Sequence, residues 1–194
     1  MDDVGAGSAE IKPRLEKALV DIASCFDAAG IDYMVIGGMA NSIWGNARAT
    51  TDVDITVAID REHVREVFAA LGNRVARVPP DLAEYLAGGV LPFTHRIEVH
   101  VDLLLSRHPY ARAAIERAVT IKVLRKPVKF CTAEDLVLHK IISERDRDQR
   151  DVEAILRRRR KTLDREYLDP HVHELAVMLD RPEIEQTYRR LMDR

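Results

Sequence analysis

GGMANSIWGNARATTDVD, the stretch of residues 37–54, sets a double glycine ahead of a pair of aspartates. Residues 31–36 before it form a short apolar run, which favours a buried strand, and residues 39–44 predict a short helix. Between a strand and the N-terminus of a helix, glycine backbone can approach an anion closely, and the first helical amides are available to bind it. We expect Gly37 and Gly38 to form a phosphate-binding turn, although many Gly-Gly pairs only let the chain bend.

Asp52 and Asp54 open the next predicted strand, in which Ile55, Val57 and Ile59 recur at every second position. Residues two apart in a strand share one face and lie about 6–7 Å apart along the backbone. Two carboxylates at that distance repel each other, and a bound divalent cation is a common way to offset the repulsion. The pair predicts metal ligands, while a solvated strand end is the simpler explanation of the pair taken alone.

Helices are predicted on both sides of this stretch. Apolar residues recur at helical spacing in residues 11–26, and Gly30 follows as a C-terminal stop. The same spacing returns in residues 64–71 before Gly72. Strand and helix therefore alternate along the first part of the chain.

Further strands complete a predicted sheet. Residues 96–105 have the pattern of a clear strand, and residues 119–123 with 128–130 predict a hairpin in which Pro127 suggests an edge position. Residues 73–93 give weaker signals and predict a short strand, a helical turn and a loop. The fold class predicted from these elements is α+β, with a mixed β-sheet flanked by helices.

The character of the chain changes after the hairpin. Thr132 and Asp135 form an N-terminal capping pattern, and every later segment has helical periodicity. We therefore predict two domains, a mixed-sheet domain at residues 1–131 and a C-terminal helical domain at residues 132–194.

The composition is that of an ordinary globular protein. The net charge of −2 over 194 residues neither implies nor excludes a nucleic-acid partner. Cys25 and Cys131 have no spacing that suggests zinc or a disulfide framework. No apolar run approaches the roughly 20 residues of a membrane span, and residues 1–10 do not have the pattern of a signal peptide. We expect a cytoplasmic protein without a membrane partner.

Residues 37–54 taken as a whole resemble the nucleotidyltransferase superfamily that includes polymerase beta, and within it the AbiEii-like toxin branch. That branch pairs a Gly-Gly turn with an Arg-x-Thr-x-Asp-h-Asp strand, in which h is apolar. The matching positions are Arg48, Thr50, Asp52 and Asp54. Smaller members carry Gly-Ser at the turn, whereas Gly38 has no hydroxyl, so backbone amides would bind the phosphate and Ser42 lies one turn further on. The resemblance implies a nucleotidyltransferase fold over the sheet domain and matches the helical domain loosely.

The resemblance also implies a third carboxylate on a later strand, and the sequence Val-Asp-Leu-Leu at residues 101–104 looks like that strand. Asp102 is therefore expected as the third acid, which its place in the apolar frame favours. By strand periodicity Glu98 and His100 share a face with Asp102, so Glu98 stays open as the alternative.

The implied activity is metal-dependent transfer of a nucleoside monophosphate from a nucleoside triphosphate such as ATP to an acceptor hydroxyl. Asp52 and Asp54 would hold one Mg²⁺ on the triphosphate, and together with Asp102 a second Mg²⁺ about 3.5–4 Å away, with Mn²⁺ as the alternative ion. Asp102 would take the proton of the hydroxyl. Arg48 would either reach a phosphate or form an ion pair with a nearby acid.

The helical part contributes one further expected contact. Residues 132–140 are similar to a segment of the toxin branch whose lysine faces the nucleotide, which implies that role for Lys140. Asp148 and Asp151 follow at helical spacing and are expected to pair with arginines. The expected nucleotide-binding residues are Gly37, Gly38, Ser42, Arg48, Thr50 and Lys140.

The acceptor stays open at this point. The toxin branch implies RNA, such as the end of a tRNA, and a cognate antitoxin as partner. If the acceptor is RNA, the basic run at residues 157–161 is the first candidate contact, although a solvated helix end explains it more simply. Other branches modify small hydroxyl compounds such as aminoglycosides, or proteins. A non-catalytic nucleotide- or protein-binding module of the same fold and a metal-dependent nuclease are the rival functions.

Overall fold

The computed structural model describes residues 4–106 and 109–193. The chain forms two compact units. Unit 1 comprises the chain up to Met39 and Ala49–Cys131, and unit 2 comprises Ala40–Arg48 and the chain from Thr132 onward. The short segment Ala40–Arg48 therefore belongs to unit 2, although it falls within the domain predicted at residues 1–131. That the two units are independently folding domains stays a prediction.

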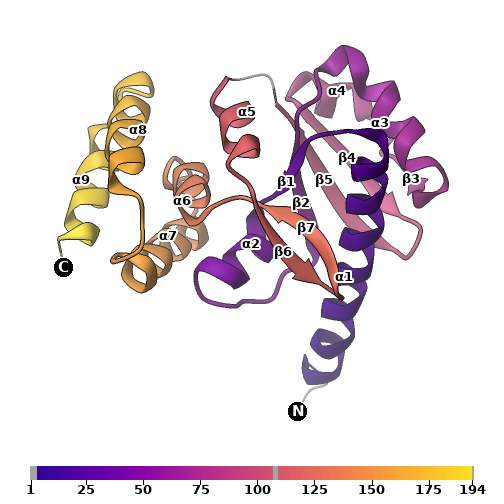
Figure 1. The fold of residues 1–194 in the computed structure, drawn as a ribbon, viewed down its shortest axis with the longest axis horizontal. Coiled ribbons are helices and arrows are strands. Elements are labelled where there is room, and N and C mark those ends of the chain that lie inside the picture. Colours follow the sequence, from indigo (N-terminus) through magenta and orange to yellow (C-terminus); the bar gives the residue numbers. More distant parts are fainter. Residues whose placement is uncertain (1–3, 107–108, 194) are drawn as a thin grey trace. The chain divides into compact units, whose positions relative to one another are not determined.

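The elements of unit 1 surround a single sheet, and helix α2 runs on from it into unit 2 (Figure 1). In chain order they are α1 (Val4–Ala29), β1 (Tyr33–Val35), α2 (Gly37–Trp44), β2 (Asp52–Val57), η1 (Arg61–His63), α3 (Val64–Leu71), η2 (Gly72–Arg74), β3 (Val75–Arg77), α4 (Leu82–Ala87), β4 (Val90–His95), β5 (Val99–Leu105), α5 (Pro109–Glu116), β6 (Val119–Val123) and β7 (Lys126–Phe130).

The sheet has seven strands in the order β3-β4-β5-β2-β1-β7-β6. Strands β2 and β5 are parallel, as are β1 and β7, and the other neighbouring pairs are antiparallel. The sheet is therefore mixed and flanked by helices, which confirms the predicted α+β class. The hairpin of β6 and β7 also forms as predicted. Pro127 does not lie in the edge strand, which is β6, but in the neighbouring strand β7, where it pairs with Lys122.

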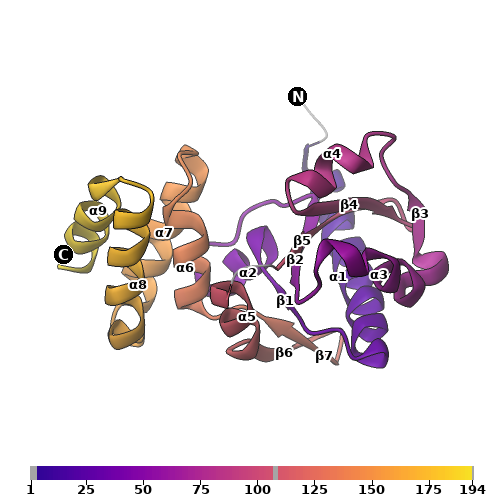
Figure 2. The ribbon, with the colours of Figure 1, turned by 90° about the horizontal axis from the view of Figure 1, so that it is seen from above.

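Helix α1 packs along the sheet and supplies much of its apolar cover. Its buried residues Leu15, Leu19, Ile22 and Phe26 are those whose helical spacing predicted the helix. Each such burial contributes about 1.5–3 kcal/mol. The helix contacts β2, β5 and β7 and lies beside α3, as Figure 2 shows.

Strand β2 has one buried face and one partly open face. Val53, Ile55 and Val57 are fully buried, whereas Asp52 and Asp54 keep part of their surface exposed. Because side chains alternate in a strand, packing the valine and isoleucine side chains into the core turns both aspartates to the other side.

Three elements differ from the prediction. The strand expected at residues 96–105 begins only at Val99, because Glu98 adopts a φ of 58° in the turn that joins β4 to β5. Strand β4 occupies residues that were expected to include a loop, and helix α5 was not predicted at all. Glycines and prolines within residues 79–92 interrupt the alternation of polar and apolar residues, so the sequence did not predict β4 as a strand.

Unit 2 is helical, as predicted for the C-terminal part of the chain. Its later elements are α6 (Ala133–Ile141), α7 (Asp146–Arg159), α8 (Arg165–Met178) and α9 (Pro182–Met192). Helix α6 packs on α7 and α8, and α9 packs on the same two helices. Their facing apolar residues form the core of this unit, with Leu136, Val152, Ile155, Leu168, Val172 and Tyr188 at most 2 % exposed.

None of the helices within residues 4–106 and 109–193 combines the length and the apolar character that a membrane crossing requires.

The N-terminus of α6 is capped as the sequence predicted. The Thr132 hydroxyl oxygen accepts a hydrogen bond from the Asp135 amide at 3.1 Å and donates to a carboxylate oxygen of Asp135 at 2.7 Å. Asp135 is fully buried, and Tyr167 donates its hydroxyl to the other carboxylate oxygen at 2.7 Å. The cap therefore satisfies a helix amide and a buried acid together.

Replacing Thr132 by alanine should lower the free energy of unfolding by about 1–2 kcal/mol, because the cap and one partner of Asp135 are lost together. Trp44, the only tryptophan of the chain, lies in unit 2, so its fluorescence during urea denaturation reports on this unit. Thr132→Ser keeps the hydroxyl and should stay near the wild-type midpoint. Equal midpoints for the alanine and serine variants would contradict the capping role.

Candidate active site

Parallel pairing of β2 with β5 brings the three predicted acids to one face of the sheet. The register pairs Asp52 with His100 and Asp54 with Asp102. Residues paired directly across parallel strands point to the same side, and Asp52 shares that side with Asp54 because the two are separated by one residue. All three acids are partly exposed, whereas the intervening Val53 is fully buried. The backbone thus gathers three carboxylates on an accessible face.

Glu98 does not belong to this group. It lies in the turn before β5 and is exposed, and its carboxylate pairs with Arg77 at 2.6 Å. The expectation that strand periodicity places Glu98 on the face of Asp102 was wrong, because β5 starts only at Val99 and Glu98 lies in the turn before it. Asp102 is the acid that the register sets opposite Asp54.

Two of the acids are held by neighbouring donors. The Thr50 hydroxyl donates to Asp52 Oδ1 at 2.7 Å, and His100 Nε2 lies 3.2 Å from Asp102 Oδ1. In the part of the chain that the structure describes, no three His, Cys, Asp or Glu side chains converge as a metal-binding group. Asp52 and Asp102 instead each contact a neighbouring polar side chain.

The glycine turn lies directly against Asp54. Gly37 has a φ of 63°, and a Cβ at this position would be only 1.8 Å from Asp54 Oδ2. The missing side chain therefore leaves a cradle that the carboxylate fills. The three acids are hard oxygen donors, the kind of ligand that Mg²⁺ and Mn²⁺ prefer.

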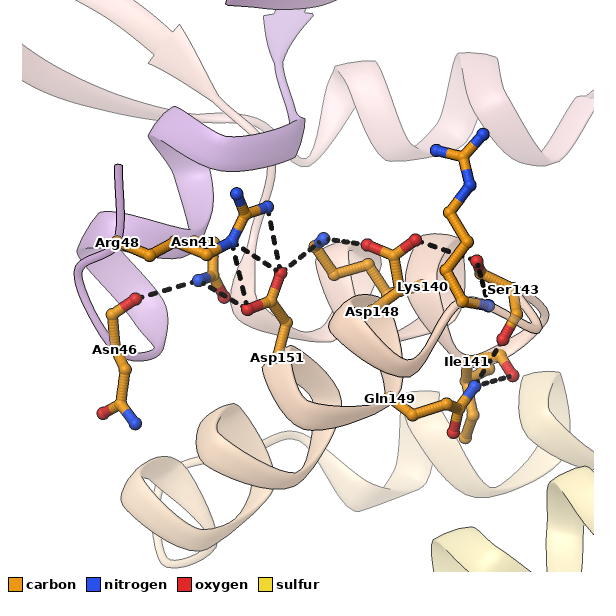
Figure 3. A network of polar contacts seen from close by, with 10 residues as sticks. Asn41, Asn46, Arg48, Lys140, Ile141, Ser143, Asp148, Gln149 and Asp151 are labelled. Carbon is orange, nitrogen blue, oxygen red and sulfur yellow. Dashed lines mark hydrogen bonds and ion pairs between the residues drawn. The ribbon is translucent and has the colours of Figure 1, made fainter. Parts of the chain in front are cut away.

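Unit 2 contains a second group of charges around Lys140. The ammonium is buried, and it donates to Asp148 Oδ1 at 2.6 Å and to Asp151 Oδ2 at 2.8 Å (Figure 3). Ser143 donates its hydroxyl to the second oxygen of Asp148 at 2.8 Å. Lys140 was expected to present its charge to a phosphate, and the structure instead places it between two carboxylates. A direct contact of Lys140 with the nucleotide stays a prediction.

Asp151 joins this lysine to Asn41 of α2 and to Arg48, which follows that helix. Arg48 Nε lies 3.3 and 3.2 Å from the two carboxylate oxygens of Asp151, and its Nη2 lies 3.2 Å from Oδ2. The Asn41 side-chain amide donates to Asp151 Oδ1 at 3.0 Å and to the Asn46 carbonyl at 2.9 Å. Figure 3 shows Asp151 between these partners and Lys140. The ion pair considered for Arg48 is therefore present.

The other predicted residues of unit 2 are less buried. Ser42 is exposed on α2. In the basic run at residues 157–161, Arg158 donates to the Gly45 carbonyl at 2.7 Å and Arg159 to the Ile43 carbonyl at 3.3 Å. The guanidinium of Arg159 also lies 5.3 Å from the ring centre of Trp44. Two arginines of the run thus bind carbonyl groups at the C-terminal end of α2, although Arg158 is exposed.

Asn41 was not identified from the sequence, although it is fully buried and bonds to Asp151. Its only signal was a polar residue within the apolar helix predicted at residues 39–44. Residues 110 positions apart in the chain meet here, and no local pattern reports such a contact.

Comparison with protein-family models matches residues 14–192 to a family described as "Nucleotidyltransferase of unknown function (DUF6036)". The chain belongs to this family. No curated protein matches the chain.

Solved structures share the nucleotidyltransferase fold. The antibiotic-resistance factor ANT(2'')-Ia in solution matches with a TM-score of 0.58 at 14% identity, covering 91% of this chain and 98% of that one. Its crystal structure with adenylyl-2''-tobramycin matches with a TM-score of 0.51 at 14% identity, covering 89% and 98%. The lincosamide antibiotic adenylyltransferase LnuA with lincomycin matches with a TM-score of 0.50 at 15% identity, covering 72% and 95%. At these identities the likeness establishes the fold.

Removing the buried cation should destabilise unit 2 strongly. In Lys140→Met, Asp148 and Asp151 both lose their lysine partner, although Asp151 keeps Arg48 and Asn41. Breaking a buried ion pair costs about 3–5 kcal/mol. Urea denaturation followed by Trp44 fluorescence measures the loss. Lys161→Met removes an exposed lysine of the same unit and should change little. If both variants unfold at the wild-type midpoint, the buried ion pairs do not stabilise the unit.

Acid should weaken unit 2 through Asp148. Burial raises the pKa of this carboxyl, but hydrogen bonds from Lys140 and Ser143 outweigh burial and hold the pKa below the ordinary 3.8. A lowered pKa in the folded state gives stability that is complete above the ordinary pKa and is lost as the pH falls through the lower folded value. Between about pH 5 and pH 2, the wild type should therefore lose more unfolding free energy than Asp148→Asn. Parallel losses in the two proteins would contradict the assignment.

Proposed function

We propose that the protein is a metal-dependent nucleotidyltransferase that moves a nucleoside monophosphate from a nucleoside triphosphate to an acceptor hydroxyl. The observation that carries the proposal is the register of β2 and β5, which sets Asp54 beside Asp102 with Asp52 on the same face. Membership of a nucleotidyltransferase family supports it.

Each residue of the site in unit 1 has a role in this proposal. Asp52 and Asp54 would hold a divalent ion at the triphosphate, and with Asp102 a second one. The ions, when bound, supply positive charge for the attacking oxygen and for the departing pyrophosphate. Asp102 would accept the proton of the acceptor hydroxyl. The backbone amides that follow Gly37 would donate hydrogen bonds to phosphate oxygens. Contacts of Ser42, Arg48, Thr50 and Lys140 with the nucleotide stay predictions.

Two acceptor classes have support of different kinds. The motif of residues 37–54 resembles the AbiEii-like toxin branch, which supports an RNA acceptor such as tRNA, with a cognate antitoxin as partner. The similar structures include an adenylyltransferase of lincosamide antibiotics and a complex with adenylyl-2''-tobramycin, which supports a small hydroxyl compound. Both acceptors present a hydroxyl to the same three acids, so the donor chemistry is common to the two proposals.

Transfer can be measured with each α-labelled nucleoside triphosphate, Mg²⁺, and either total RNA or a panel of aminoglycosides and lincosamides. We expect label in one acceptor class. Asp52→Ala and Asp54→Ala should lower the rate at least about a hundredfold, because a lost metal ligand removes several kcal/mol of transition-state stabilisation. If no triphosphate is bound or consumed with any acceptor, a non-catalytic binding module replaces the enzyme proposal.

Glu98, in the turn before β5, provides a control for the assignment of Asp102 as the third acid. Asp102→Asn should lower the transfer rate to the same extent as Asp54→Ala, because the carboxylate that completes the site is neutralised. Glu98→Gln removes a carboxylate four residues away that pairs with Arg77, and should leave the rate near wild type. A rate loss in Glu98→Gln with full activity in Asp102→Asn would reverse the assignment.

A further inference from the structure

The second glycine of the turn makes a close approach that differs from that of the first. A Cβ on Gly38 would lie 2.4 Å from Thr50 Oγ1 and 2.8 Å from Thr50 Cβ. Contacts that short do not occur between real side chains, and here the neighbour is a short, branched residue instead of the end of a flexible chain. The threonine therefore fills the space that any side chain at position 38 would need.

Backbone conformation does not explain the glycine at position 38. Gly37 has a positive φ, but Gly38 is not among the residues with positive φ, and it lies within helix α2. Alanine is a better helix former than glycine, so helix stability alone would favour alanine at this position. What excludes alanine is the threonine.

Thr50 in turn holds the first metal-ligating acid of the proposed site. Its hydroxyl donates to Asp52 Oδ1 at 2.7 Å. A hydroxyl that donates to one carboxylate oxygen fixes the rotation of that carboxylate and leaves the second oxygen to other partners. Moving Thr50 away from the turn would therefore move Asp52.

Each of the two glycines therefore makes room for a group that belongs to, or holds, a different aspartate. Gly37 leaves room for the carboxylate of Asp54, and Gly38 leaves room for Thr50, which holds Asp52. We infer that Thr50 is a positioning residue that orients Asp52 for the metal ion, and that Gly38 is required because it makes room for Thr50. This inference rests on the proposed function, since it assigns Asp52 to the metal.

The steric half of the inference is tested without metal by thermal unfolding of four proteins: wild type, Gly38→Ala, Thr50→Gly and the double variant. Gly38→Ala should lower the melting temperature when Thr50 is present. In the Thr50→Gly background the same change should raise it, because the clash is gone and helix propensity remains. A rise in both backgrounds would overturn the close approach.

The positioning half is tested by Mn²⁺ binding, measured by electron paramagnetic resonance in the presence of a non-hydrolysable ATP analogue. Thr50→Val keeps the shape but loses the hydroxyl, and should raise the Mn²⁺ dissociation constant about tenfold, because a hydrogen bond to a charged ligand is lost. Thr50→Ser keeps the hydroxyl and should bind nearly as the wild type does. The double variant Gly38→Ala with Thr50→Gly should bind as weakly as Thr50→Val although its steric conflict is relieved.

The outcomes separate this inference from the proposed function. Equal Mn²⁺ affinity in wild type and Thr50→Val, with clear binding in both, would overturn the positioning role and leave the proposed function standing. No Mn²⁺ binding by the folded wild type in the presence of the nucleotide analogue would overturn the proposed function and the positioning role together.

Discussion

Asp54 and Asp102 stand opposite each other on parallel strands, with Asp52 on the same face, and the fold has to bring these negative charges together against their repulsion. Two unit charges about 6 Å apart repel by about 3 kcal/mol at an effective dielectric constant of about 20. Burying the apolar residues of the opposite face contributes about 1.5–3 kcal/mol for each side chain, so the core outweighs the repulsion. The same alternation that buries Val53, Ile55 and Val57 therefore exposes the acids.

The negative charges of the carboxylates are balanced differently in the two units. In unit 2, Lys140 and Arg48 supply positive charge to Asp148 and Asp151, and Asn41 adds an amide to Asp151. The charges of that group are balanced by the chain itself, and its contacts join α6 and α7 to Asn41 and Arg48. In unit 1, Asp52 accepts a hydrogen bond from a threonine hydroxyl, and Asp102 lies beside an exposed imidazole. Carboxylates held in this way on an open face are suited to a cation and to the phosphates that it carries.

Much of this arrangement follows from local sequence patterns, because the physics behind them is local. The alternation of Ile55 and Val57 predicted β2, the spacing of Leu15 to Phe26 predicted α1, and Thr132 with Asp135 predicted the start of α6. The pairing of Asp54 with Asp102 could be expected only through the family resemblance, since the register between distant strands depends on the whole sheet.

Other features had no local signal. The turn at Glu98 precedes β5, whereas periodicity alone would extend that strand back through this residue. The positive φ of Glu98 cannot be predicted from the alternation of polar and apolar residues. The family resemblance implied that Lys140 faces the nucleotide, but its carboxylate partners come from the next helix and have no local signal. The fit of Gly38 against Thr50 depends on distances of a few ångströms that only the folded backbone defines.

A crystal structure with a non-hydrolysable nucleoside triphosphate and Mn²⁺, with an anomalous map at the manganese edge, tests the central claim most directly. The account predicts manganese bound by Asp52 and Asp54, a second ion shared with Asp102, and the triphosphate against the turn of Gly37 and Gly38. Triphosphate bound elsewhere, or manganese that does not touch these three carboxylates, would contradict it.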